Sequence, residues 1–356
     1  MVERISRLRE FLPDKHSAVL ITSDVNRFYF SGFKSSAGAV FVTNYSATLL
    51  VDFRYFEAAD KKVGDKINVI CYKKLFDSLN EIIAKEQVTT VIIEDDDVTV
   101  NELSKLKRSI NAEVVTDFEV SSKILDLRMI KSETEIEKII TAQKITEKSY
   151  LTLLNFVKEG VTERQLSVEL EYLMKKNGAE RIAFDLITIS GKNTSLPHGV
   201  PSDKMLCSGD FITFDIGAVY DGYHSDMTRT VALGYATDEM HKIYDIVLTA
   251  HNKAAHKIIS GNTCADVDNA ARNYIVSKGY GECFGHTTGH GVGLEIHEKP
   301  TVYLSDDTVL RNNMIITNEP GIYIPSKFGV RIEDMYLVTD NGRKDLAFIE
   351  KELIIL

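Results

Sequence analysis

Two aspartates occupy unusual positions in the stretch from Phe211 to Arg229, which is otherwise rich in strand-forming residues. Asp215 interrupts an apolar run, and a buried carboxylate is costly unless it is paired or holds a metal ion. Asp226 follows after an Asp221-Gly222 turn signal. A hairpin would bring both carboxylates side by side, and a cation between them would relieve their repulsion. The stretch therefore predicts part of a metal site.

A second pair of acids, Glu319 and Glu333, occupies corresponding positions further along the chain. Asp215 and Glu319 are each followed by glycine at the second position, and Asp226 and Glu333 each come shortly before a methionine. Each acid pair is also preceded by two glycines 18 residues apart, with a threonine two residues after the first glycine. This repetition predicts a helix–helix–hairpin unit used twice. The two acid-bearing hairpins would face each other in a pseudo-twofold domain.

Three histidines, His286, His290 and His297, lie in a glycine-rich segment between the two acid pairs. Glycine allows the backbone to approach a site closely. A lone histidine would be interpreted as an ordinary polar loop residue, but three beside four acids favour a site. The segment has no His-Glu-x-x-His sequence, which argues against a helix-borne single-zinc peptidase motif.

The charge of the four acids predicts the number of metal ions. Four carboxylates carry four negative charges, which two divalent cations neutralise. Carboxylates can bridge two ions roughly 3.5–4 Å apart, and such a pair activates a water nucleophile. Oxygen-rich ligation with one imidazole favours Mn²⁺, with Co²⁺, Fe²⁺ or Zn²⁺ as alternatives.

The elements that position these residues follow from the local patterns. The first 120 or so residues alternate strands and helices, which predicts a mixed sheet covered by helices. Strands are expected at 18–22, 39–43, 47–51, 67–71, 90–94 and 112–115, and helices at 2–11, 76–86 and 100–109. A capping box at Ser132–Glu135 opens a long helix expected to reach about residue 157. Further helices are expected at 162–178, from 238 to before Gly261, and at 263–279.

Composition excludes several classes of function. A length of 356 residues predicts two domains, and the net charge of −10 argues against a nucleic-acid binder. No apolar run is long enough to span a bilayer, so no membrane association is expected, and the N-terminus lacks a signal-peptide core. Four scattered cysteines predict reduced thiols in the cytoplasm and argue against a disulfide framework or a catalytic cysteine.

Several motifs together resemble those of the pita-bread metallopeptidases, most closely the Xaa-Pro peptidases, aminopeptidase P and prolidase. They are Tyr29–Gly38, Ile124–Ser132, Pro197-His198-Gly199, Asp215-Ile-Gly217, Ser225–Thr230, His286–Gly293, His297-Glu298, Glu319–Tyr323 and Val330–Asp334. The resemblance implies an α+β architecture with a creatinase-like N-terminal α/β domain at residues 1–124 and a pita-bread catalytic domain at 125–356. It also implies a homodimer and small peptide substrates with proline at the second position.

By this resemblance, five residues match the family's metal ligands: Asp215, Asp226, His290, Glu319 and Glu333, with Asp226 and Glu333 bridging both ions. His198, His286, His297 and Arg331 match positions that line the substrate site. The implied mechanism is attack of a metal-bridging hydroxide on the Xaa-Pro carbonyl. Glu319 would move the proton, His297 would stabilise the oxyanion, and His198 would contact the substrate near the leaving nitrogen.

Three alternatives use the same fold. They are a non-catalytic binding protein, a creatinase-like amidinohydrolase and a methionine aminopeptidase. The complete acid set argues against the first two, and the N-terminal domain together with His198 argues against the third. Within the Xaa-Pro branch both a dipeptidase and an aminopeptidase remain open, and Arg331 is a candidate for holding a substrate carboxylate in either.

Overall fold

The computed structural model describes residues 1–116 and 118–356. By its internal contacts the chain divides into two units, Met1–Leu127 and Arg128–Leu356. In the two described stretches, no helix has the length and apolar character needed to cross a bilayer.

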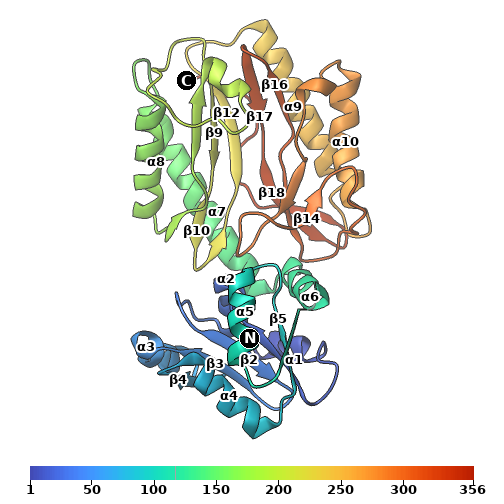
Figure 1. The fold of residues 1–356 in the computed structure, drawn as a ribbon. Coiled ribbons are helices and arrows are strands. Elements are labelled where there is room, and N and C mark those ends of the chain that lie inside the picture. Colours follow the sequence, from blue (N-terminus) through green and yellow to red (C-terminus); the bar gives the residue numbers. More distant parts are fainter. Residues whose placement is uncertain (117) are drawn as a thin grey trace. The chain divides into compact units, whose positions relative to one another are not determined.

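The described residues of the first unit form a mixed six-stranded sheet in the order β4-β3-β2-β1-β5-β6 (Figure 1). Its strands are β1 (Ser17–Ile21), β2 (Ala39–Thr43), β3 (Ala47–Val51), β4 (Asn68–Cys71), β5 (Thr90–Ile93) and β6 (Glu113–Thr116). Pairs β1–β2 and β2–β3 are antiparallel, and the other neighbours are parallel. All residues of β1 and β2 are buried, as expected for central strands covered on both faces.

Three helices that begin in the described part of the first unit are not predicted by the sequence patterns. Its helices are α1 (Val2–Arg9), α2 (Asp24–Ser31), α3 (Phe53–Val63), α4 (Leu75–Glu86) and α5 (Val100–Ser109), and α6 (Phe118–Met129) extends into the second unit. In α2 the last six residues are all buried, so the helix lacks the amphipathic period that reveals most helices. The unpredicted helices are α2, α3 and α6, and α6 covers part of the Ile124–Ser132 motif.

The second unit contains two similar halves, each with a pair of helices against its own strands. The helices are α7 (Glu133–Leu153), α8 (Glu163–Lys176), α9 (Asp238–Ala255) and α10 (Cys264–Ser277), with short 3₁₀ turns η1 (Leu154–Phe156), η2 (Gly191–Ser195) and η3 (Gly281–Cys283). Helices α7 and α8 flank the strands on one side and α9 and α10 on the other (Figure 1). Capping boxes begin α8 at Thr162 and α10 at Thr263, as the repeat predicts. Helix α7 ends at Leu153, earlier than expected, because its last turn tightens into η1.

Each predicted hairpin is built from two strand pairs, an outer pair at its base and an inner pair next to its turn. The strands are β7 (Arg181–Ile182), β8 (Ile187–Ser190), β9 (Phe211–Ile216), β10 (Ala218–Tyr220), β11 (Tyr223–His224), β12 (Met227–Ala232), β13 (Gly289–Gly291), β14 (Glu298–Val302), β15 (Ile315–Asn318), β16 (Gly321–Ile324), β17 (Phe328–Arg331), β18 (Asp334–Thr339) and β19 (Gly342–Asp345). In the first half β9 pairs antiparallel with β12, and β10 with β11. In the second half β15 pairs with β18, and β16 with β17.

The two halves also have separate apolar cores. Ile212 and Phe214 of β9 pack with Leu166 and Leu170 of α8. In the other half, residues of α9 and α10 pack with those of β15, β17 and β18. An isolated bridge between Thr228 and Glu333 joins the halves at the place where the acids gather.

Candidate metal centre

One cavity of about 860 Å³ in the second unit is lined by all nine site residues predicted from the sequence. They are His198, Asp215, Asp226, His286, His290, His297, Glu319, Arg331 and Glu333.

Strand ends place the four acids at equivalent points of the two halves. Asp215 lies near the end of β9, and Glu319 directly follows β15. Asp226 directly precedes β12, and Glu333 directly precedes β18. Both outer hairpins therefore deliver one acid from the outgoing strand and one from the returning strand, as the repetition predicts.

His290 is held in a tautomer that directs a lone pair at the acids. Its Nδ1 lies 3.0 Å from the carbonyl oxygen of Gly291, which can only accept, so Nδ1 carries the proton. Burial, together with the neighbouring His297, lowers the pKa of His290 to about 4, so the ring is neutral. Its Nε2 then faces Asp226 Oδ2 at 3.5 Å and Glu319 Oε1 at 3.4 Å. A lone pair pointing at two carboxylates fits a cation between them.

The carboxylates themselves are destabilised in their ionised form. Burial raises the pKa of Asp226 well above its ordinary value, and the charges of Asp215 and Glu319 raise it further. The pKa of Glu333 rises in the same way, from burial and then from Asp226. Burial raises the pKa of Glu319 to about 8. Bound cations would stabilise the ionised forms of all these groups.

The donor atoms converge closely enough for a shared cation. One oxygen each from Asp226 and Glu333 and one nitrogen of His290 all lie within 4.8 Å of one another. The Oδ1 atom of Asp226 is buried and has no hydrogen-bond partner among the described residues. Such an atom is rare unless something outside the chain satisfies it. The residues present therefore fit a divalent metal ion.

Asp215 lies apart from that closest group because an arginine holds it. Arg331 Nη2 donates to Asp215 Oδ2 at 2.5 Å, and Arg331 Nη1 donates to the hydroxyl of Tyr323 at 2.7 Å. The Tyr323 hydroxyl lies 2.9 Å from His286 Nε2. Because burial lowers the pKa of His286 to about 4 and its Nδ1 faces the Thr287 carbonyl, Nε2 accepts the Tyr323 proton. A chain of polar contacts thus runs from His286 to Asp215.

The remaining two histidines border the cavity. The ring of His297 lies 4.4 Å from that of His290, edge to face, and burial lowers the pKa of His297. His198 lies in the loop after η2, and the preceding Pro197 accepts a hydrogen bond from Arg331 through its carbonyl.

Two residues that contact the predicted site residues were not singled out by sequence reasoning. Tyr323 joins His286 to Arg331, and Thr228 donates to Glu333 Oε2 at 2.7 Å. Both lie inside the motifs that carry the family resemblance, where a hydroxyl in an apolar strand is the available signal. His286 is 37 residues from Tyr323 and Glu333 is 105 residues from Thr228, so spacing alone does not reveal these contacts.

Models of two known families match this chain. Metallopeptidase family M24 matches residues 137–340, and the Creatinase/Prolidase N-terminal domain matches residues 4–130. The first match covers the cavity and all nine predicted site residues.

Relatives match along nearly the whole chain. The Xaa-Pro dipeptidase of Pyrococcus horikoshii is 43% identical over 358 residues, which covers 99% of both proteins. Among solved structures, an Xaa-Pro dipeptidase from Bacillus anthracis has a TM-score of 0.95 at 40% identity and 99% coverage of both chains. An X-Pro aminopeptidase from Thermotoga maritima has a TM-score of 0.93 at 34% identity, covering 99% of this chain and 100% of that one. The chain therefore belongs to metallopeptidase family M24, and it combines the family's pita-bread domain with a creatinase/prolidase N-terminal domain.

Proposed function

We propose that this protein is a metal-dependent exopeptidase that hydrolyses the Xaa-Pro bond in dipeptides or at the N-terminus of short peptides. The observation that carries the proposal is the neutral His290, whose lone pair faces two buried carboxylates in a cavity lined by three other histidines. The choice of an Xaa-Pro bond is supported by the names of the relatives, which include both dipeptidases and an aminopeptidase.

Five residues would hold two divalent ions, for which Mn²⁺ is our first choice and Co²⁺, Fe²⁺ and Zn²⁺ are alternatives. They are Asp215, Asp226, His290, Glu319 and Glu333. We assign the bridging positions to Asp226 and Glu333, which come from opposite halves of the domain. The bound ions would activate a water molecule and neutralise the charge that develops on the scissile carbonyl oxygen.

The chain's own residues would bind the peptide and move its protons. Glu319 would take a proton and deliver it to the leaving nitrogen, because it lines the cavity and its Oε1 lies 3.4 Å from His290 Nε2. His297 would donate a hydrogen bond to the carbonyl oxygen. His198 and His286 would border the bound peptide.

Most of the hydrogen-bond donors of Arg331 are already used by other residues of the chain, which bears on its predicted role in holding a substrate carboxylate. Its guanidinium donates to Thr228, Pro197, Tyr323 and Asp215, which occupies four of its five N–H groups. We therefore propose that Arg331 acts mainly by orienting Asp215. A bidentate hydrogen bond to a substrate carboxylate would first require Arg331 to release one of these partners.

We also propose roles for the two domains, a cellular location and an oligomeric state. Residues 125–356 would form the catalytic domain and residues 1–124 the creatinase-like N-terminal domain, since every residue lining the cavity lies between 164 and 333. A cytoplasmic location is supported by the four cysteines, all of which have free thiols. A homodimer is supported by the family resemblance alone.

One assay tests the function. Metal-free protein reconstituted with Mn²⁺ is offered Ala-Pro, Ala-Pro-Ala and, as a control without proline, Ala-Ala. We expect release of alanine from at least one proline peptide and loss of this activity with a chelator. Cleavage of neither proline peptide, or cleavage that a chelator leaves unchanged, would contradict the proposal. Metal binding without cleavage would instead favour a non-catalytic binding protein.

A further inference from the structure

The last residues of the chain lie along strand β12, which begins beside Asp226. The amide of Ala232 donates to Ile354 O and the amide of Leu356 donates to Ala232 O, each at 2.9 Å. Gly234 N donates to Leu356 O at 2.7 Å. We call residues 349–356 the C-terminal segment. Its backbone is thus held against the strand that leads away from the proposed bridging ligand.

Arg229 joins the C-terminal segment to both strands that carry the proposed bridging ligands. It is almost fully buried, and its N–H groups donate to five acceptors. The acceptors are the carbonyl oxygens of Thr228 (2.9 Å), Glu333 (2.7 Å), Ile349 (3.1 Å) and Glu350 (3.2 Å), and Asp334 Oδ1 (2.6 Å). A guanidinium has five N–H donors, so this arginine is fully committed.

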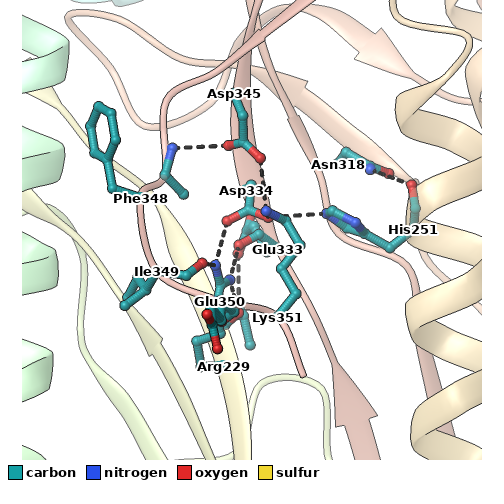
Figure 2. A network of polar contacts seen from close by, with 12 residues as sticks. Arg229, His251, Asn318, Glu333, Asp334, Asp345, Phe348, Ile349, Glu350 and Lys351 are labelled. Atoms are coloured by element: carbon teal, nitrogen blue, oxygen red, sulfur yellow. Dashed lines mark hydrogen bonds and ion pairs between the residues drawn. The ribbon is translucent and has the colours of Figure 1, made fainter. Parts of the chain in front are cut away.

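Lys351 of the C-terminal segment completes the network around Asp334 (Figure 2). Its Nζ lies 3.0 Å from Asp334 Oδ2 and 2.7 Å from Asp345 Oδ2. Asp334 therefore has Arg229 at one oxygen and Lys351 at the other. His251 Nε2 lies 3.4 Å from Asp334 Oδ2, and the His251 carbonyl accepts a hydrogen bond from Asn318, the residue before Glu319.

This network lies directly behind the proposed metal ligands. Asp334 follows Glu333 in sequence, and the amide of Glu333 donates to the Thr228 carbonyl at 3.1 Å. Because Asp226 and Glu333 directly precede β12 and β18, a change in the spacing of these strands would change the distance between the two carboxylates. Lys351 comes from neither strand and is 18% exposed, so it can be replaced without altering the strands themselves.

We propose that Lys351 is a positioning residue for the metal centre, which it serves by fixing Asp334 and thereby the separation of the strands that carry Asp226 and Glu333. The inference rests on the proposed function, because it takes these two acids as metal ligands. It adds a role for the C-terminal segment, which contributes no residue to the lining of the cavity.

Three variants test the proposal. Lys351→Met removes the charge at similar length, Lys351→Arg keeps the charge, and Lys344→Met is the matched control on the exposed part of β19. Titration calorimetry of the metal-free proteins gives the affinity for Mn²⁺, and kcat for Ala-Pro is measured at saturating Mn²⁺. Losing a direct hydrogen-bond partner of a metal ligand typically reduces metal affinity or activity about 10–100-fold. Lys351 acts one contact further out, through Asp334, so we expect the lower end of this range, roughly a 10-fold weaker affinity for Lys351→Met. Lys351→Arg should recover most of it, and the control should match the wild type.

A purely structural role for Lys351 predicts a different pattern. Lys351→Met would then melt at a lower temperature but bind Mn²⁺ and turn over substrate like the control, and this result would overturn the proposal. If Lys351→Met does not fold, Lys351→Gln removes the same charge but keeps a polar end, and an unchanged Mn²⁺ affinity there would also overturn the proposal. A wild-type protein that binds Mn²⁺ but cleaves no Xaa-Pro peptide contradicts the proposed substrate, and the ratio of affinities still decides the role of Lys351. A wild-type protein that binds no divalent ion overturns both proposals.

Discussion

At the scale of single residues, the chemistry depends on protonation states that only the folded chain defines. The sequence places His290 in a glycine-rich segment with other histidines, which favours a site, and the family resemblance adds the prediction that His290 is a ligand. The contact between its Nδ1 and the Gly291 carbonyl then leaves Nε2 free for a cation. Tyr323 could not be predicted in the same way, because its partners His286 and Arg331 become neighbours only through the fold.

Replacing Tyr323 with phenylalanine tests the chain of contacts from His286 to Asp215. Burial raises the pKa of Tyr323 to about 12, so its hydroxyl is neutral and both donates and accepts. Leaving buried partners unsatisfied costs about 1–3 kcal/mol, which chemical denaturation of Tyr323→Phe should show as a lower free energy of unfolding. We also expect a lower kcat/KM, because Arg331 loses a contact that orients it toward Asp215.

Tyr150→Phe provides the matched control. The Tyr150 hydroxyl is buried but has no hydrogen-bond partner among the described residues. Its removal should leave stability and activity nearly unchanged. Equal effects of the two substitutions would show that the Tyr323 hydroxyl has no special role.

At the scale of elements, the duplicated hairpins were largely predictable from the sequence, whereas their inner strands were not. Matching acids, glycines and threonines predicted two similar units, and β9–β12 and β15–β18 correspond to them. The inner pair β10–β11 joins a different sheet together with β7, a tertiary choice that local patterns do not encode. The segment from β13 to β14 carries His290 and His297, and its conformation is held by hydrogen bonds to one buried carboxylate.

This carboxylate belongs to Glu298, whose side chain is buried. Its carboxylate accepts from the amides of Leu294 and Glu295 and from Arg128 and Lys131. Burial alone would raise the pKa of Glu298, but the charges of Lys131 and Arg128 lower it to about 2, so the group is ionised. The carboxylate thereby anchors the segment between the two histidines.

The substitution Glu298→Gln should strongly destabilise the protein. It leaves two buried cations without their shared counter-charge, and breaking a buried ion pair in this way costs about 3–5 kcal/mol. Denaturation experiments should show this loss, and activity should fall because His297 is adjacent. Glu295→Gln is the control, since Glu295 also pairs with Arg128 but is 48% exposed and should cost at most about 1 kcal/mol. Comparable stability of both variants would contradict the anchoring role.

At the scale of the whole molecule, the sequence was most informative where patterns repeat. The mixed sheet of the first unit follows from its alternating strands and helices, and its β2–β3 hairpin matches the expected residues. Helix α2 was missed because its burial follows no helical period, although Ser23 caps it. Helix α3 was missed although Asp52 caps it, and its length of 11 residues is similar to that of the predicted helix α5, which has 10. The buried acids of the second unit, by contrast, make the stability of that unit depend on pH.

We expect the metal-free protein to lose stability as the pH rises. The pKa of Glu319 is raised by burial from 4.5 to about 8, so its neutral form is favoured in the folded state. The stability that this group contributes is fully present below about pH 4.5 and is lost as the pH rises through about 8. Melting temperatures of metal-free protein should therefore fall between about pH 6 and about pH 9, and Mn²⁺ should reduce the fall. A melting temperature that rises over this range would contradict the assignment, and Glu319→Gln should flatten the dependence.

The most direct test of the central claim is the metal content of Asp226→Asn, measured together with its hydrolysis of Ala-Pro. Asparagine keeps the shape of Asp226 but lacks the charge needed to bridge two cations. We predict that the wild type binds two divalent ions per chain, and that Asp226→Asn binds fewer and has almost no activity. Asp221→Asn, at the tip of the same hairpin, should keep both properties. Near-wild-type metal content and turnover in Asp226→Asn would contradict the account.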